Sequence, residues 1–147
     1  MKQLLTGVLL LLLVSSFVIL QNTVHADDIT GTWLSQKKEG KIEIYKSGNE
    51  YAGKLVWASK MYEPDGVTSK KDKNNPDDQL RSRNLKDLPM LNGFVFKDGT
   101  WTDGRIYDPE SGKTYRSIIK LTNNKLNIRG YIGISLFGRT TEWTRVR

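Results

Sequence analysis

Hydrophobic and polar residues alternate one by one along much of the chain, most clearly near its end. In residues 126–146, Leu126 and Ile128 fall on one side of an extended chain, and Asn127 and Arg129 fall on the other. Side chains of a β-strand alternate between its two faces, so this spacing predicts a strand with one buried face. After a short interruption a second alternating run brings the chain back. The stretch is therefore predicted to form a hairpin.

The same alternation recurs upstream, where turn signals such as Ser47-Gly48-Asn49 and Asp98-Gly99 separate the runs. Eight strands are expected, over residues 31–35, 41–47, 51–58, 91–97, 100–107, 113–121, 125–132 and 139–146. A last strand with an open edge invites aggregation, and pairing with the first strand removes that edge. We therefore predict an all-β fold, a single up-and-down antiparallel eight-stranded barrel, with a β-sandwich as the alternative.

One long polar insertion, residues 59–90, breaks the regular spacing of the strands. Asn75 followed by Pro76 has the form of a helix start, so a short helix is expected from about Asp77 to Leu88. Such a helix would place Leu80, Leu85 and Leu88 against the barrel. The run before it, residues 70–75, is too polar to enter a core. Long insertions in compact domains are often functional, so the insertion is also a candidate lid.

The N-terminal residues differ from the rest of the chain. Lys2 precedes a nearly unbroken apolar segment, residues 4–20, and a polar stretch follows that ends in Val24-His25-Ala26, with small residues where a signal peptidase requires them. This is typical of a signal peptide cleaved after Ala26, because the apolar segment is short for a membrane span of about 20 residues. An uncleaved membrane anchor is the alternative. The predicted division is a signal peptide over residues 1–26 and a β-barrel domain over residues 27–147, exported to the periplasm or secreted.

The amino-acid composition limits the kinds of catalytic and metal site that the chain could contain. The chain carries a net charge of +7, has no cysteine, and has one histidine, His25, inside the predicted signal peptide. Triads that need His or Cys are therefore excluded from the mature domain, and neither a metal site nor a cofactor is expected. The carboxylates that could still serve as acid and base are Asp103, Asp108 and Glu142. Enzymatic activity is uncertain, and the chain is more readily understood as a binding protein.

Several short motifs carry a resemblance to a known family. They are Gly31-Thr32-Trp33, Asn74-Asn75-Pro76-Asp77, Leu80-Arg81-x-Arg83, Tyr107-Asp108-Pro109-x-x-Gly112-Lys113-x-Tyr115, Arg129-Gly130-Tyr131 and Phe137-Gly138-Arg139-Thr140-x-x-Trp143-x-Arg145. Together they resemble a bacterial domain-of-unknown-function family of small exported proteins. The resemblance implies a lipocalin-like or calycin-like barrel and supplies no activity.

The first-strand motif is also similar to the lipocalin signature, in which an arginine of the last strand covers the tryptophan. Arg145 or Arg139 could stack on Trp33 in this way at the closed end of the barrel. Trp33, Trp143 and Arg145 are therefore expected to close the barrel.

The candidate ligand-binding residues are aromatic or basic, and each also has a purely structural interpretation. Arg81 and Arg83 either form local salt bridges or capture an anion. Trp101, Asp103, Arg105 and Tyr107 are expected to share one face of a strand, and the sequence leaves open whether that face points inward. The full set of candidates is Trp57, Arg81, Arg83, Arg105, Tyr107, Tyr115 and Arg139.

Three functions remain open at the level of sequence. The first is non-enzymatic binding of a small amphipathic or anionic ligand inside the barrel. The second is an interaction module for an envelope protein or an anionic envelope lipid or polymer, to which the basic charge is suited. The third is a carboxylate-based glycan hydrolase. Nucleic acid is not an expected partner, because the chain lacks the aromatic and basic motifs of nucleic-acid binders.

Overall fold

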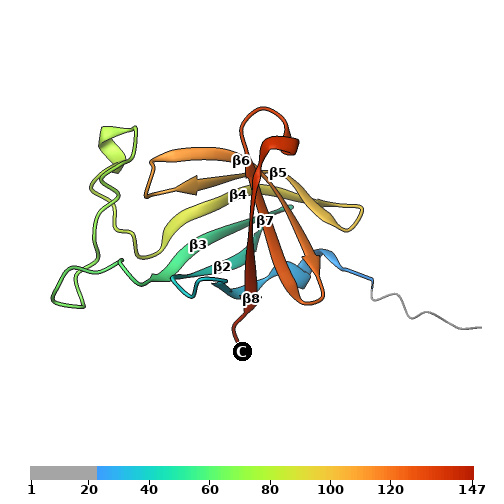
Figure 1. The fold of residues 1–147 in the computed structure, drawn as a ribbon, viewed down its shortest axis with the longest axis horizontal. Coiled ribbons are helices and arrows are strands. Elements are labelled where there is room, and N and C mark those ends of the chain that lie inside the picture. Colours follow the sequence, from blue (N-terminus) through green and yellow to red (C-terminus); the bar gives the residue numbers. More distant parts are fainter. Residues whose placement is uncertain (1–22) are drawn as a thin grey trace, which may run out of the picture.

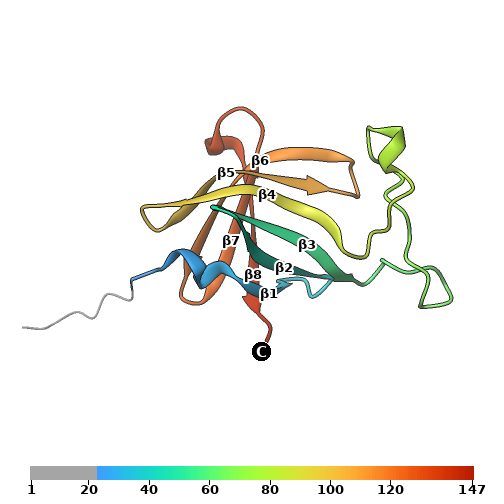
Figure 2. The same ribbon diagram turned by 180° about the vertical axis from the view of Figure 1, so that it is seen from behind.

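The computed structural model describes residues 23–147, so most of the predicted signal peptide lies outside the described residues. Eight antiparallel strands form a closed barrel in sequence order (Figures 1 and 2), which confirms the predicted fold. The strands are β1 (Gly31–Ser35), β2 (Gly40–Ser47), β3 (Glu50–Ala58), β4 (Leu88–Lys97), β5 (Thr100–Asp108), β6 (Lys113–Thr122), β7 (Lys125–Tyr131) and β8 (Arg139–Arg145). Each lies within three residues of the bounds expected from alternation.

The barrel is closed by pairing between its first and last strands. Trp33 of β1 lies opposite Arg145 of β8, and Ser35 lies opposite Trp143. This pairing leaves neither terminal strand with an open edge, which was the reason for expecting it. A β-sandwich has two separate sheets, so the closed ladder rules out that alternative.

One half of the barrel interior is filled by large aromatic side chains. Trp33, Phe94 and Trp101 are fully buried there. The 3-10 helix η1 (Ala26–Ile29) covers this end. Trp33 Nε1 donates a hydrogen bond to the Ile29 carbonyl (2.8 Å), and Trp101 Nε1 donates one to the Ala26 carbonyl (3.0 Å). Both indole donors are thus satisfied while their rings fill the barrel, as buried tryptophan requires. We call this end the closed end.

A bulge in β5 changes which residues face the core. Asp103 has a positive φ of 62°, and the pairing with β6 shifts register between Trp101 and Gly104. The extra residue reverses the alternation, so Trp101 points inward whereas Arg105 and Tyr107 point outward. The expectation that these residues share one face with Trp101 is therefore wrong, because strict period-two counting cannot register an inserted residue.

The insertion between β3 and β4 has little helix. The helix expected from about Asp77 to Leu88 is the single 3-10 turn η2 (Asp78–Leu80), with Asp77 accepting the Gln79 amide at its start. Leu88 is buried and Leu85 packs against the core as expected, but Leu80 is exposed. No helix of the described residues is long and apolar enough to cross a membrane.

Candidate functional site at the barrel mouth

The end of the barrel opposite the closed end contains a cavity. In an up-and-down barrel the connections after β1, β3, β5 and β7 all lie at this end, which we call the mouth. The cavity there has a volume of about 300 Å³. It is lined by residues of β5 to β8, namely Ile106, Asp108, Tyr115, Ile128, Gly130, Arg139 and Thr141.

Strand pairing explains why these side chains meet. Ile106 lies opposite Tyr115, and Gly130 lies opposite Arg139, so each pair shares the inner face. Gly130 provides part of the space. A Cβ atom at this position would lie 3.5 Å from both Ile106 Cγ2 and Tyr115 Cβ, so a larger side chain would extend into the cavity.

The lining combines an apolar floor with polar groups toward the rim. Ile106 and Ile128 provide the apolar surface. Asp108 is already engaged by its own turn, where its carboxylate accepts hydrogen bonds from the Glu110 amide (3.0 Å) and the Ser111 hydroxyl (2.6 Å). Arg139 makes no ion pair with any described residue. The cavity therefore carries two charges: the Asp108 carboxylate, held in its own turn, and the Arg139 guanidinium, which is the group able to bind an anion.

The hydroxyl of Ser117, two residues further along β6 than Tyr115 and on the same face, is buried deeper in the barrel. Ser117 is buried, and its Oγ is the one buried side-chain polar atom of the described residues without a hydrogen-bond partner. It lies opposite Gly130, a lining residue, on the inner face. Buried polar groups are nearly always paired, so this hydroxyl is an exception; it lies below the residues that line the cavity.

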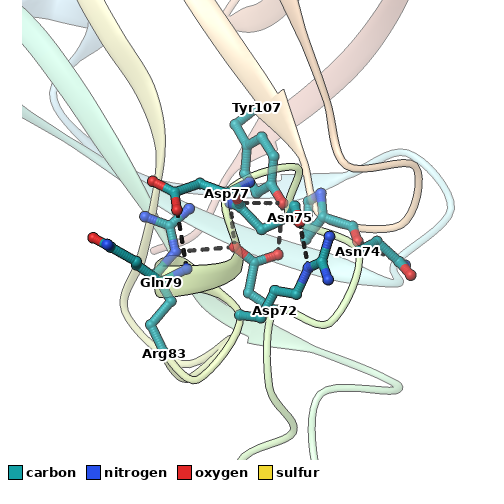
Figure 3. A network of polar contacts seen from close by, with 9 residues as sticks. Asp72, Asn74, Asn75, Asp77, Gln79, Arg83 and Tyr107 are labelled. Carbon is teal, nitrogen blue, oxygen red and sulfur yellow. Dashed lines mark hydrogen bonds and ion pairs between the residues drawn. The ribbon is translucent and has the colours of Figure 1, made fainter.

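A second polar cluster lies outside the barrel, where the insertion meets β5 (Figure 3). At its centre, Asp72 is fully buried. Its carboxylate accepts hydrogen bonds from Tyr107 OH (2.6 Å), Asn75 Nδ2 (2.9 Å) and Arg83 Nε (2.9 Å). A charged group in a dry environment is tolerated only when paired in this way. The expectation that residues 70–75 are too polar for the interior is therefore wrong at Asp72 and at Asn75, which is also buried.

The cluster fastens the insertion to the barrel. Burial, together with the Asp72 carboxylate, raises the pKa of Tyr107 to about 12, so the phenol remains a hydrogen-bond donor. The Arg83 guanidinium lies 5.5 Å from the centroid of the Tyr107 ring. Nearby, the Asn74 amide donates to the carbonyls of Pro109 (3.2 Å) and Glu110 (2.8 Å). These contacts hold the middle of the insertion against β5 and the β5–β6 turn.

The candidate binding residues from the sequence fall into separate places. Tyr115 and Arg139 line the mouth cavity. Arg83 and Tyr107 belong to the Asp72 cluster, beside Arg81, which pairs with Asp78 and donates to the Asn75 carbonyl (2.7 Å).

The other two candidates lie apart from the cavity. Arg105 is exposed on the outer side of β5 and lines a groove of about 320 Å³ beside Tyr107. Trp57 lies opposite Lys41, whose ammonium is 5.6 Å from its ring centroid.

Residues that the sequence reasoning missed are mostly small or aliphatic. Ile106, Ile128, Gly130 and Thr141 line the cavity, yet nothing in their own identity distinguishes them from core residues. The signal that could have found them is strand pairing, because each lies opposite or beside Tyr115 or Arg139 once the register is known.

At the closed end, Arg145 rather than Arg139 covers Trp33. Its guanidinium carbon lies 4.3 Å from the indole centroid, a distance at which a cation and an aromatic face attract each other. The same guanidinium donates to the backbone carbonyls of Thr30 (2.6 Å) and Asp28. Trp143 is half-buried and packs against the core.

The three carboxylates considered as an acid–base pair have separate partners. Asp103 accepts a hydrogen bond from Thr102 (2.9 Å), Asp108 caps its own turn, and Glu142 pairs with Lys125 (2.8 Å). Within residues 23–147, no three His, Asp or Glu side chains gather closely enough to hold a metal ion.

Comparison with known proteins agrees with this fold. A solved structure, protein HP1028 from the human pathogen Helicobacter pylori, described as belonging to the lipocalin family, is similar to the chain with a TM-score of 0.71. The two are 23% identical, and the match covers 85% of each chain. The fold is thus that of a lipocalin-like barrel. The chain belongs to a family described as uncharacterized proteins conserved in bacteria (DUF2147), whose model matches residues 31–145. No curated protein matches the chain.

Proposed function

We propose that this barrel is a non-enzymatic binding protein whose mouth takes a small amphipathic ligand with an anionic head group. The observation that carries the proposal is the mouth cavity, which joins an apolar floor to an arginine that makes no ion pair with any described residue. A volume of about 300 Å³ is at the lower end of the range for small-molecule sites, which favours a short alkyl chain over a large lipid.

The lining suggests how such a ligand would lie. Its alkyl part would cover Ile106 and Ile128, which removes apolar surface from water. Its anionic group would face Arg139, with the Thr141 and Tyr115 hydroxyls as further partners. The aromatic side chains that fill the closed end leave the ligand no deeper position, so the site is confined to the mouth.

A titration with decanoate and with decanol, which shares the alkyl chain and lacks the charge, tests the proposal. Arg139→Gln should weaken decanoate binding about tenfold, as expected for the loss of one charge-assisted hydrogen bond, and leave decanol binding unchanged. Arg105→Gln is the matched control, because Arg105 lies on the outer side of the same barrel, away from the cavity.

Two results would contradict the proposal. One is a wild-type protein that shows no saturable binding of either probe. The other is a decanoate affinity that Arg139→Gln and Arg105→Gln reduce equally, because that would locate the anion on the surface of the barrel rather than in its mouth.

We also propose that the protein is exported and that residues 1–26 are removed. Removal would take away the Ala26 carbonyl that accepts the Trp101 Nε1 hydrogen bond, so this indole donor would bond to water at the closed end of the mature protein. Support comes from the apolar segment over residues 4–20 and the small residue Ala26 before the acidic pair Asp27-Asp28. N-terminal sequencing of the protein recovered from the host envelope or medium should begin at Asp27. Recovery of an intact Met1 from the membrane fraction would instead favour an anchored protein.

A further inference from the structure

The connection between β7 and β8, residues 132–138, exposes an unusual amount of apolar surface. Ile132 is 71% exposed, Ile134 58%, Leu136 74% and Phe137 81%. Among the other large apolar residues that the structure describes, Val67 alone is exposed to a similar degree. We call residues 132–138 the tip; it forms the loop that projects at the top of Figure 1.

The tip has a fixed shape that keeps these side chains outward. The Arg129 guanidinium donates to the carbonyls of Ser135 (2.7 Å) and Leu136 (3.0 Å) and to the Thr140 hydroxyl (2.9 Å). The 3-10 turn η3 (Ser135–Phe137) lies between these contacts. The polar backbone is therefore turned toward β7 and satisfied there, so the apolar side chains are left to face solvent.

Close packing at the base of the tip also indicates that the tip has a fixed shape. A Cβ atom at Gly138 would lie 2.7 Å from the Gly130 carbonyl oxygen and 3.0 Å from Tyr131 Cβ. Glycine is thus the residue that lets the chain return directly onto the barrel. The tip backbone is thus fastened at the outer face of β7, where Leu136 lines a pocket with Ile118 while remaining 74% exposed.

Basic and aromatic residues surround the tip. Arg129 and Arg139 flank it on β7 and β8, and Arg116 of β6 lies over the ring of Tyr131 (5.8 Å from guanidinium carbon to ring centroid). The nearest acidic residue along β8, Glu142, is paired with Lys125. An apolar protrusion surrounded by arginine and tyrosine has the composition of segments that lie at a membrane interface.

We propose that the tip inserts its apolar side chains into the surface of a lipid bilayer that bears anionic head groups. A bilayer is favoured over a protein partner because the tip is a protruding loop with four strongly exposed apolar side chains and arginines at its base, which suits a fluid apolar layer under negative charge. The inference goes beyond the binding function proposed above, because docking does not require an occupied cavity. Gly130 and Arg139 form the last strand pair before the tip, so docking would bring the mouth close to the bilayer.

Position-specific fluorescence tests the proposal. The chain contains no cysteine, so Ile134→Cys and Val67→Cys each provide one labelling site, and both residues are strongly exposed. Each labelled protein is mixed with vesicles of phosphatidylcholine and phosphatidylglycerol that carry quenchers on their acyl chains. We expect at least severalfold stronger quenching at residue 134 than at residue 67. This readout reports insertion of the tip itself, whatever the N-terminal residues do.

A second arm measures vesicle binding by sedimentation. The double variant Leu136→Ser/Phe137→Ser should bind the anionic vesicles at least tenfold more weakly than the wild type, whereas Val67→Ser should bind them equally. Arg116→Gln should weaken binding to anionic vesicles and leave binding to pure phosphatidylcholine unchanged. Decanoate titration of the double variant should match the wild type, which separates a failure of docking from a failure of the cavity proposal.

Three outcomes would overturn the proposal. They are equal quenching at residues 134 and 67, equal sedimentation of the double variant and the wild type, and a wild-type protein that fails to bind the vesicles. A tip-dependent dimer in solution, lost in the double variant and accompanied by no vesicle binding, would identify a second copy of the chain as the occupant instead.

Discussion

Two connections lie at the mouth: the insertion over residues 59–87 and the tip over residues 132–138. Their burial is the opposite of what their composition suggests. The insertion is strongly polar, yet Asp72 near its middle is fully buried. The tip is strongly apolar, yet Phe137 is 81% exposed. Polarity alone therefore does not decide which segment lies against the barrel; the availability of partners does.

The partners differ in kind between the two connections. Asp72 receives hydrogen bonds from the side chains of Tyr107, Asn75 and Arg83, so a long polar segment is tied to β5 at one buried point. The tip is held mainly through its backbone, by the Arg129 guanidinium. In the insertion, the polar side chains find hydrogen-bond partners and are buried. In the tip, the backbone carbonyls find hydrogen-bond partners and the apolar side chains remain exposed to solvent.

The largest effect is expected from Asp72→Ala. This change leaves the Arg83 guanidinium and the Tyr107 hydroxyl without their acceptor, and loss of one partner of a buried charged pair costs about 3 kcal/mol. Chemical denaturation should show this loss, and trypsin should then cut more readily after Arg81 or Arg83. Asp65→Ala is the matched control, because Asp65 caps an exposed turn of the same insertion. Equal effects of the two changes would show that the Asp72 cluster does not fasten the insertion.

An intermediate effect is expected at alkaline pH. The pKa of Tyr107 is raised from 10.0 to about 12, so between these values the unfolded chain loses the phenol proton while the folded chain keeps it. Stability should therefore fall as the pH rises through this window, by on the order of 2 kcal/mol for this residue.

Tyr51, at the closed end, shows the same shift because of burial and its bond to Asp27, and supplies an internal comparison. The free energy of unfolding should be measured at about pH 9 and about pH 11.5. Tyr107→Phe should lose less stability between these two values than the wild type, and the loss that remains should be the contribution of Tyr51. An unchanged pH slope in Tyr107→Phe would contradict the assignment.

A smaller effect is expected from Arg129→Ala. The change removes the donors to the tip carbonyls of Ser135 and Leu136, which water can partly replace, so a stability loss of about 1 kcal/mol is expected. Amide hydrogen exchange should speed up in residues 133–138 and remain unchanged in the insertion. Unaltered exchange in the tip would mean that its shape does not depend on Arg129.

The smallest effect is expected from Leu136→Ser/Phe137→Ser. Both side chains are solvent-exposed, so the free energy of unfolding should change by no more than about 0.5 kcal/mol. Thermal and chemical denaturation both measure this. A loss comparable to that of Asp72→Ala would show that the tip packs against the barrel in solution, which would remove the contrast between the two connections.

The sequence was sufficient for the barrel and insufficient for much of the site. Strands were predictable because alternation is a local property, and the pairing of the first strand with the last followed from the need to protect an edge. Burial of Asp72 was not predictable, because it depends on Tyr107, 35 residues away. The outward direction of Tyr107 depends in turn on the bulge at Asp103, which no alternation rule reveals.

The candidate site was partly predictable for the same reason. Tyr115 and Arg139 stood out by their chemistry and do line the cavity, whereas Ile106 and Ile128 are indistinguishable from core residues until the strand register is known. The 3-10 turn at Asp78–Leu80 is shorter than the expected helix; Asn75 before it donates to Asp72, and Arg81 after it donates to the Asn75 carbonyl.

Methyl NMR of the isoleucines during titration with decanoate tests the central claim most directly, because isoleucines lie at both ends of the barrel. If decanoate binds at the mouth, the signals of Ile106 and Ile128 should shift in a saturable way, while those of Ile29 and Ile44 toward the closed end should not move. Saturable shifts at Ile29 and Ile44, or no shift at Ile106 and Ile128, would contradict the claim.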